Sequence, residues 1–323
     1  MSGGLAMESA EKIVRCRKCF IALLLILLLS LCGCADYREK PTGEPAYIRD
    51  LQLINNTVYW LERTDGSYAL FRGNADEKER IKRFPDVAGI AFCEDLNGYL
   101  YAADGVLSAY DPESDTTAKI CDLYANALLC ATEDYVLAST ESGDLRIEIA
   151  NGSKQAVEHM PRKGVEILDI NGNVIVFWDH NQSAICKYDC DRDSTAVLYS
   201  RARNPAVVMV TAIMQNGWLY YAESAGGLHK ISMEDESAAS RLVSVKSVIA
   251  MARAGDGMVL AIKERSDLVF YLCSGEDAMT ELAVWHDANY IVNGSCLLSA
   301  SDNKIACAVT SEQQIFEFEI PDN

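Results

Sequence analysis

The sequence predicts an all-β fold, a β-propeller of seven blades of about 40 residues each, placed after an N-terminal export signal. Three observations lead to this prediction. Short runs of alternating apolar and polar residues dominate the chain, Gly, Asn, Asp and Ser separate the runs, and the pattern repeats along the sequence. Alternation bounded by turn residues is typical of successive antiparallel strands.

The repeating unit is a polar turn followed by an aromatic or aliphatic strand. Its seven copies are NNTVYWLERT (55–64), NGYLYAAD (97–104), EDYVLAST (133–140), NGNVIVFWD (171–179), NGWLYYAES (216–224), GDGMVLAIK (255–263) and DNKIACAVT (302–310). Between successive copies, the second turn residue recurs after 36 to 46 positions. A period near 40 residues, filled only with short strands, fits one four-stranded propeller blade.

A further strand is expected after each marked strand. The predicted ranges are 68–72, 106–110, 145–149, 184–188, 228–231, 268–272 and 315–320. The last unit ends at its third strand, so we expect a strand from the N-terminal stretch near Tyr47 to close the ring, because an open ring exposes two unpaired edges. A β-sandwich or two stacked β domains are the alternative architectures.

The N-terminus has the pattern of an export signal. Basic residues precede an almost wholly apolar run at 20–31, which is shorter than the roughly 20 apolar residues that a membrane span needs. The sequence Leu31-Cys32-Gly33-Cys34 follows and resembles the bacterial lipobox, which implies cleavage before Cys34 and a lipid on its sulfur. An ordinary secretory signal or a short uncleaved anchor is the alternative.

These features predict three regions and a location. Residues 1–33 are a cleaved lipoprotein signal peptide, 34–45 are the lipidated cysteine and a polar tether, and 46–323 are the propeller domain. The lipid on Cys34 would hold the protein at the extracytoplasmic face of the cell membrane.

Composition narrows the classes of partner. The formal net charge of −18 disfavours nucleic acid and anionic lipid headgroups as ligands. Eight cysteines follow Cys34, and most lie inside apolar alternating runs, so we expect mostly free, buried thiols. An even number in an exported protein leaves disulfides as the alternative.

Two pairs of segments, Val58-Tyr59-Trp60-Leu61 with Phe71-Arg72 and Trp218-Leu219-Tyr220-Tyr221 with His229-Lys230-Ile231, carry a family resemblance. The chain resembles bacterial lipoproteins whose bodies are similar to the low-density-lipoprotein-receptor type (YWTD-like) of β-propeller. It departs from that pattern in lacking Thr-Asp after Tyr59-Trp60. The resemblance implies that the domain binds a protein ligand rather than catalysing a reaction.

The turn after each marked strand contains a carboxylate, and in a propeller these turns share one rim. The predicted acidic rim consists of Asp65, Asp104, Glu141, Asp179, Glu223, Glu264 and Glu312. A ring of acids would favour cations or a basic segment of another protein. The alternative is that an acidic chain simply has acidic turns.

The favoured function is a non-enzymatic binding or scaffold lipoprotein for a protein, peptide or cell-wall component. The alternative is an extracytoplasmic hydrolase or lyase with its site at the propeller channel, although the four histidines fall at no common phase of the repeat. No cofactor is expected. Calcium near Asp189, Asp191 and Asp193 is a weaker hypothesis, because the calcium-loop glycine and glutamate are replaced by serines; a solvated turn is the alternative.

Overall fold

The structure is a computed structural model of the chain. It describes residues 47–320 apart from 65–66, 74–76, 161–163, 201–208, 225–226, 236–240, 245, 274–278, 289–290, 292–295, 302 and 311–313. Pro45–Asn323 forms one compact unit. The predicted signal peptide, lipidation site Cys34 and tether lie outside the described residues. Within the described residues no helix is long and apolar enough to cross a membrane.

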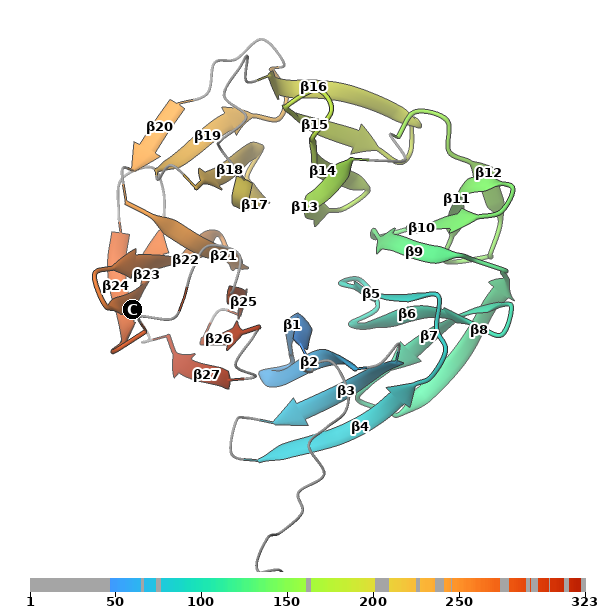
Figure 1. Cartoon of the computed structure of the whole chain (residues 1–323), viewed down its shortest axis with the longest axis horizontal. Coiled ribbons are helices and arrows are strands. Elements are labelled where there is room, and N and C mark those ends of the chain that lie inside the picture. Colours follow the sequence, from blue (N-terminus) through green and yellow to red (C-terminus); the bar gives the residue numbers. More distant parts are fainter. Residues whose placement is uncertain are drawn as a thin grey trace, which may run out of the picture. The chain divides into compact units, whose positions relative to one another are not determined.

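Seven antiparallel sheets form a ring, and their strands follow chain order from the centre outward (Figure 1). Blades 1 to 3 are β1 (Tyr47–Ile54), β2 (Thr57–Thr64), β3 (Ser67–Gly73), β4 (Lys78–Phe84); β5 (Gly89–Cys93), β6 (Gly98–Ala103), β7 (Val106–Asp111), β8 (Thr116–Asp122); and β9 (Ala127–Ala131), β10 (Tyr135–Thr140), β11 (Gly143–Glu148), β12 (Lys154–Ala156). Blades 4 and 5 are β13 (Val165–Asn171), β14 (Val174–Asp179), β15 (Ala184–Asp189), β16 (Ser194–Ser200); and β17 (Met209–Gln215), β18 (Trp218–Glu223), β19 (Leu228–Ser232), β20 (Arg241–Ser244). Blades 6 and 7 are β21 (Val248–Ala254), β22 (Gly257–Glu264), β23 (Asp267–Cys273), β24 (Met279–Trp285); and β25 (Cys296–Ala300), β26 (Lys304–Val309), β27 (Gln314–Glu319).

The seven-bladed propeller predicted from the sequence is confirmed. Six marked segments contain the second strand of a blade, and the seventh, 255–263, covers β22 except its last residue; every predicted further strand overlaps the third strand. Short turns of two to four residues before the second strands explain this regularity. Asn55 and Asn56 have φ angles of 47° and 62°, as a type I′ hairpin turn requires.

The core consists of seven apolar clusters, one at each seam between neighbouring blades. Alternate residues of a second strand face opposite seams. In β14, Ile175 and Phe177 pack toward blade 3, whereas Val176 and Trp178 pack toward blade 5. A second strand buried on both faces reads as a nearly continuous apolar run, and this is why these strands dominate the sequence signal.

The expected closure of the ring is wrong. The strand that holds Tyr47 is β1, and it pairs with β2 inside blade 1 rather than joining blade 7. The type I′ turn at Asn55 and Asn56 makes β1 and β2 a hairpin, which fixes this pairing. In the described residues blade 7 therefore has three strands, and the ring closes by packing of side chains.

The seam between blades 7 and 1 is apolar with a few polar ties. Trp60 of β2 lies in one cluster with Ala306, Ala308 and Ile315 of blade 7. The main-chain N–H of Ile48 donates to the carbonyl of Thr310 over 3.3 Å.

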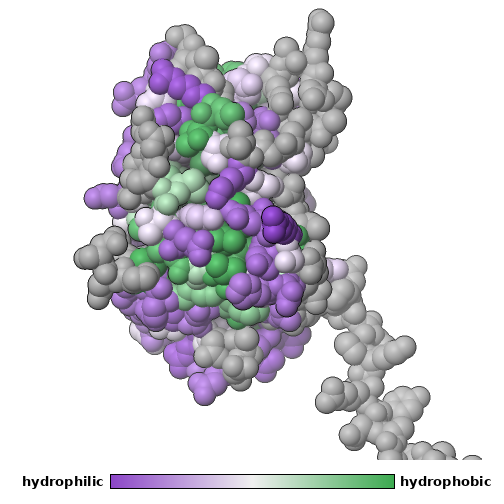
Figure 2. Space-filling view, turned by 90° about the vertical axis from the view of Figure 1, so that its left-hand side faces the viewer, coloured by the Kyte–Doolittle hydropathy of each residue, from purple (hydrophilic) through white to green (hydrophobic). Residues whose placement is uncertain are grey.

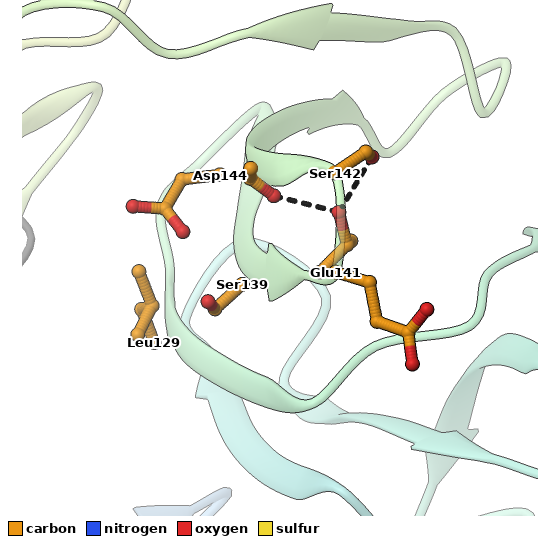
Figure 3. Close-up of a pocket in the computed structure, with 7 residues that line it drawn as sticks. Leu129, Ser139, Glu141, Ser142 and Asp144 are labelled. Atoms are coloured by element: carbon orange, nitrogen blue, oxygen red, sulfur yellow. Dashed lines mark hydrogen bonds between the residues drawn. The ribbon is translucent and has the colours of Figure 1, made fainter.

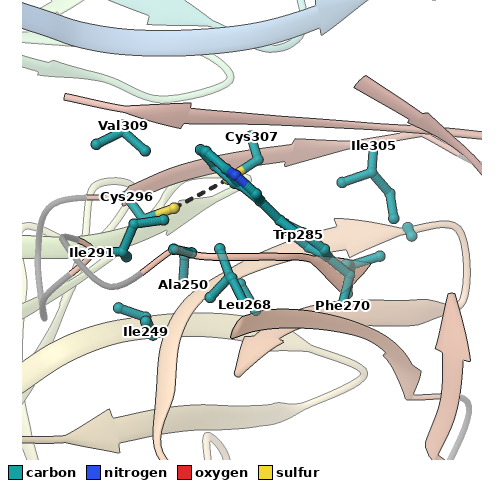
Figure 4. Close-up of a cluster of buried hydrophobic side chains, with 14 of the residues drawn as sticks. Ile249, Ala250, Leu268, Phe270, Trp285, Ile291, Cys296, Ile305, Cys307 and Val309 are labelled. Atoms are coloured by element: carbon teal, nitrogen blue, oxygen red, sulfur yellow. Dashed lines mark hydrogen bonds between the residues drawn. The ribbon is translucent and has the colours of Figure 1, made fainter. Parts of the chain in front are cut away.

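The cluster between blades 6 and 7 is drawn in Figure 4. It includes Trp285 and the thiols of Cys296 and Cys307, whose sulfur atoms are 3.1 Å apart. On this side of the ring hydrophobic side chains reach the surface among hydrophilic ones (Figure 2). Phe316 and Phe318 of β27 are half-buried against the cluster.

Candidate functional site

The rim that carries the turns between second and third strands also carries the connections from one blade to the next. At blades 2 and 3 these segments enclose an open pocket of about 520 Å³. Its walls are the connection at 86–88, the end of β6 with its turn at 102–105, the connection at 123–126 and the turn at 140–142. We call it the Tyr124 pocket.

A second hollow of about 250 Å³ adjoins the Tyr124 pocket, because both include Thr140, Glu141 and Ser142 (Figure 3). The hydroxyl of Thr140 donates to the carbonyl of Gly143 over 2.6 Å and lies 3.0 Å from the Ser142 hydroxyl. These contacts hold the turn in which Glu141 and Asp144 point to opposite sides (Figure 3). The two hollows therefore form one continuous surface.

Main-chain hydrogen bonds fix the walls of the Tyr124 pocket. The N–H groups of Ala88, Leu123 and Asn126 donate to the carbonyls of Ala102, Gly105 and Ser139, over 2.8, 2.7 and 2.7 Å respectively. Each bond joins a blade-to-blade connection to a neighbouring blade. The pocket is thus formed by anchored backbone rather than by loose side chains, which lowers the ordering cost of binding.

Tyr124 is the most exposed large hydrophobic residue in the described part of the chain, at 83 % exposure. Its ring lies on Gly105, because a Cβ built at that glycine would be 2.5 Å from the Cε1 of Tyr124. Gly105 also has a φ of +76°, which favours glycine. The glycine therefore both makes the turn and gives the ring its place.

The structure brings two members of the predicted acidic rim together. Asp104 and Glu141 are exposed and line the Tyr124 pocket. Asp65 and Glu312 lie outside the described residues. Binding of a partner by the rim stays a prediction.

The other described members of the predicted rim have local partners or are buried. Asp179 is 2 % exposed and accepts hydrogen bonds from the main-chain N–H groups of Asn181 and Gln182. Glu223 is 7 % exposed. Glu264 accepts a hydrogen bond from Lys246 over 2.8 Å, which lowers the pKa of its carboxyl group.

A charged tie lies among the innermost strands, which line the centre of the ring (Figure 1). Arg253 of β21 donates to Asp169 of β13 over 2.6 Å and to the carbonyl of Met214 of β17 over 3.2 Å. The N–H of Met214 donates to the same Asp169 oxygen over 2.6 Å. A β-bulge at Ile167/Asp169 sets the direction of the carboxylate.

The Asp169–Arg253 tie joins blades 4, 5 and 6 and is largely buried, with side-chain exposures of 13 % and 27 %. Burial raises the pKa of Asp169 to about 6, although Arg253 and the main-chain donors oppose the shift. Glu94, after β5, faces the same arginine at 3.8 Å. Because the Asp169 oxygen already accepts two hydrogen bonds, the arrangement suits a structural tie better than a catalytic base.

The four histidines contact different partners. His159 is 3.6 Å from Asp193, His180 is 3.5 Å from Glu166, and His286 is 3.2 Å from Asp267. His229 stacks on Tyr221 with ring centroids 5.3 Å apart.

The acidic turn at 189–193 holds its own hairpin. The Asp189 carboxylate accepts hydrogen bonds from the main-chain N–H groups of Asp191 and Arg192. The carboxylate of Asp191 accepts a hydrogen bond from the Tyr135 hydroxyl, and that of Asp193 accepts one from the Tyr188 hydroxyl over 2.7 Å. The same arrangement occurs in blade 2, where the Tyr110 hydroxyl donates to Asp115 over 2.9 Å. In the described ranges no three His, Cys, Asp or Glu side chains form a group that could hold a metal.

Sequence reasoning missed Tyr124 and Asp86, which lie in connections between blades. The alternation of apolar and polar residues marks the second strands and therefore the turns that follow them. The connections between blades have no such alternation, so no pattern singles them out. The one available signal was Gly105, directly after Asp104, since a glycine in a turn allows another chain segment to approach closely.

Comparisons with known proteins agree with this architecture. No family model matches the chain, and the search of curated proteins found no match. Among solved structures, the RRP9 WD40 repeats have a TM-score of 0.56 and 10% identity, with 86% of this chain and 96% of that chain covered. Hsv2p of Kluyveromyces lactis has a TM-score of 0.52 and 14% identity, with coverages of 87% and 94%.

A bacterial structure is similar as well. PorZ, described as a surface component of the type-IX secretion system of Porphyromonas gingivalis, has a TM-score of 0.50 and 12% identity; 87% of this chain and 39% of that chain are covered. At these identities the likeness concerns fold alone. The chain is therefore similar in fold to solved structures that include a WD40-repeat domain.

Proposed function

We propose that the chain is a membrane-anchored, extracytoplasmic binding protein without enzymatic activity, and that the rim with the Tyr124 pocket receives a segment of a partner protein. The lipobox-like sequence ending at Cys34 supports the anchor. The fold supports binding, since propellers present their loops as a broad surface around one mouth. The observation that carries the proposal is the preformed pocket of about 520 Å³ on that surface.

The alternative is a hydrolase or lyase with its site at the channel. Such a site needs a nucleophile or base with an orienting partner and room for substrate. Asp169 and Arg253 are the charged pair that the described inner strands bring together, and they bond to each other and to main-chain groups. This favours binding at the rim over chemistry at the channel.

Site-specific photocrosslinking of the full lipidated chain in its own membranes tests the proposal. Glu133 precedes β10 and Ser142 lies in the turn after it, so a photoreactive residue at each position samples opposite rims of the same blade. Both positions are exposed, which makes Glu133 a matched control. We expect a discrete crosslinked protein from position 142 and none from position 133. Crosslinks from position 133 alone, or from neither position, would overturn the proposal.

A further inference from the structure

The charged side chains that line the Tyr124 pocket and the adjoining hollow are all carboxylates. They are Asp86, Asp104, Glu141 and Asp144, and they come from three different segments of chain. Lysines on the neighbouring outer strands have other partners: Lys119 donates to the Asp122 carboxylate over 2.6 Å, and Lys154 donates to the Asp122 carbonyl. The described lining of the Tyr124 pocket itself thus contains three carboxylates, Asp86, Asp104 and Glu141, and no lysine or arginine.

An aromatic face accompanies this charge. Tyr124 presents its ring to solvent at 83 % exposure, while Gly105 beneath it and the Leu123–Gly105 hydrogen bond fix the segment. An exposed tyrosine on anchored backbone costs little conformational entropy when it is covered by a partner, which is why tyrosines are frequent among energetically dominant contact residues. This observation is independent of the carboxylates.

The two features together select a chemical class of ligand. A cation stacked on the face of a tyrosine gains electrostatic energy, and a guanidinium can stack on the ring and still donate to carboxylates at its edge. A lysine ammonium offers a point charge without the planar stacking surface. The pocket volume exceeds that of one side chain, which leaves room for the adjoining residues of an extended segment.

We infer that the Tyr124 pocket recognises an arginine side chain presented by an extended segment of the partner protein. Asp104 and Glu141 would receive the guanidinium, and the ring of Tyr124 would cover its face. This inference rests on the proposed function, because it names the partner chemistry at the rim that the function assigns to binding.

Peptide binding to the full lipidated chain in detergent micelles tests the inference. The probes are three peptides of one length that differ at a single central residue, which is arginine, lysine or citrulline, the neutral isostere of arginine. We expect the arginine peptide to bind about tenfold more tightly than the citrulline peptide, with lysine between them. Equal binding of all three would overturn the inference.

Variants locate the site. We expect Tyr124→Leu to weaken binding of the arginine peptide about tenfold, whereas Tyr124→Phe retains it. The double variant Asp104→Asn with Glu141→Gln, which replaces both carboxylates by amides, should also weaken binding about tenfold. The double amide Asp95→Asn with Glu133→Gln removes the same charge from exposed positions on the opposite rim of the same two blades, and it should change binding less than twofold. Equal weakening by both double variants would show a non-specific effect of net charge and overturn the inference.

Crosslinking separates this inference from the proposed function. If the partner still crosslinks from position 142 while Tyr124→Leu and the Asp104/Glu141 amide variant capture it normally, the rim binds protein but arginine recognition at the pocket is wrong. If no partner crosslinks from position 142, the proposed function fails first.

Discussion

Replacing Asp169 by asparagine should remove a pH dependence from the stability of the propeller. Burial raises the pKa of Asp169 from 3.8 to about 6 in the folded chain. Between about pH 4 and pH 6 the folded state therefore binds more protons at this site than the unfolded state. The stabilising contribution of the protonated group is complete below about pH 4 and is lost as the pH rises through 6.

The size of the effect follows from the shift. A change of about two pH units corresponds to about 3 kcal/mol of unfolding free energy. The side chain is 13 % exposed, so solvent screens it little. Urea denaturation of wild type and Asp169→Asn at pH 4, 5, 6 and 7 measures the difference in unfolding free energy between them. The contributions of the other carboxylates cancel in this difference, because both proteins contain them.

We expect wild type to lose about 3 kcal/mol relative to Asp169→Asn between pH 4 and pH 7. A companion variant, Arg253→Met, removes the cation that lowers the pKa of Asp169, so the carboxyl carbon signal should titrate above pH 6 in that variant. A stability difference that stays constant from pH 4 to 7 would refute the reasoning.

Four further predictions concern the anchor, the thiols, a turn and the ring seam. Cys34→Ala should release the processed protein from the membrane fraction in detergent partitioning; retention after signal cleavage would contradict the lipid anchor. Alkylation of the native protein at pH 8 should modify half-buried Cys121 before the seven buried thiols, among them Cys186, whose pKa burial raises to about 11; mass spectrometry showing four disulfides would contradict this. Asp179→Ala removes the acceptor of the turn after β14 and should lower the unfolding free energy by about 1–3 kcal/mol in urea, and an unchanged midpoint would show that water replaces the carboxylate. Trp60→Ala at the seam between blades 7 and 1 should cost about 3–5 kcal/mol and speed proteolysis, unless the seam collapses to fill the cavity.

The repeat could be predicted because each second strand is buried on both faces and starts after a short turn of two to four residues. Burial yields a short apolar run, as in β14 and β22, and the turn requires Asn, Asp or Gly. Both constraints act within ten residues of chain, so they are visible in one sequence. The outer strand of blade 3, β12, is exposed and three residues long, and it leaves no such pattern.

The site was less predictable because it depends on contacts between units. Asp104 and Glu141 could be placed on a shared rim, since each follows a second strand. The same reasoning grouped them with Asp179, which lies at an equivalent sequence position yet is 2 % exposed. The tie between Asp169 and Arg253 spans 84 residues, and no local pattern pairs them.

The way the ring closes has a consequence for the order of folding. Blades 1 to 6 consist of strands adjacent in the chain, so each can form by local hairpin pairing. The face of blade 1 that carries Ile48 and Trp60 stays uncovered until Ala306 and Ile315 arrive from blade 7, about 250 residues later. A chain that folds during its synthesis exposes this apolar face until blade 7 has been made. The seam is therefore where a chaperone would be needed most, and where two partly folded chains would exchange blades.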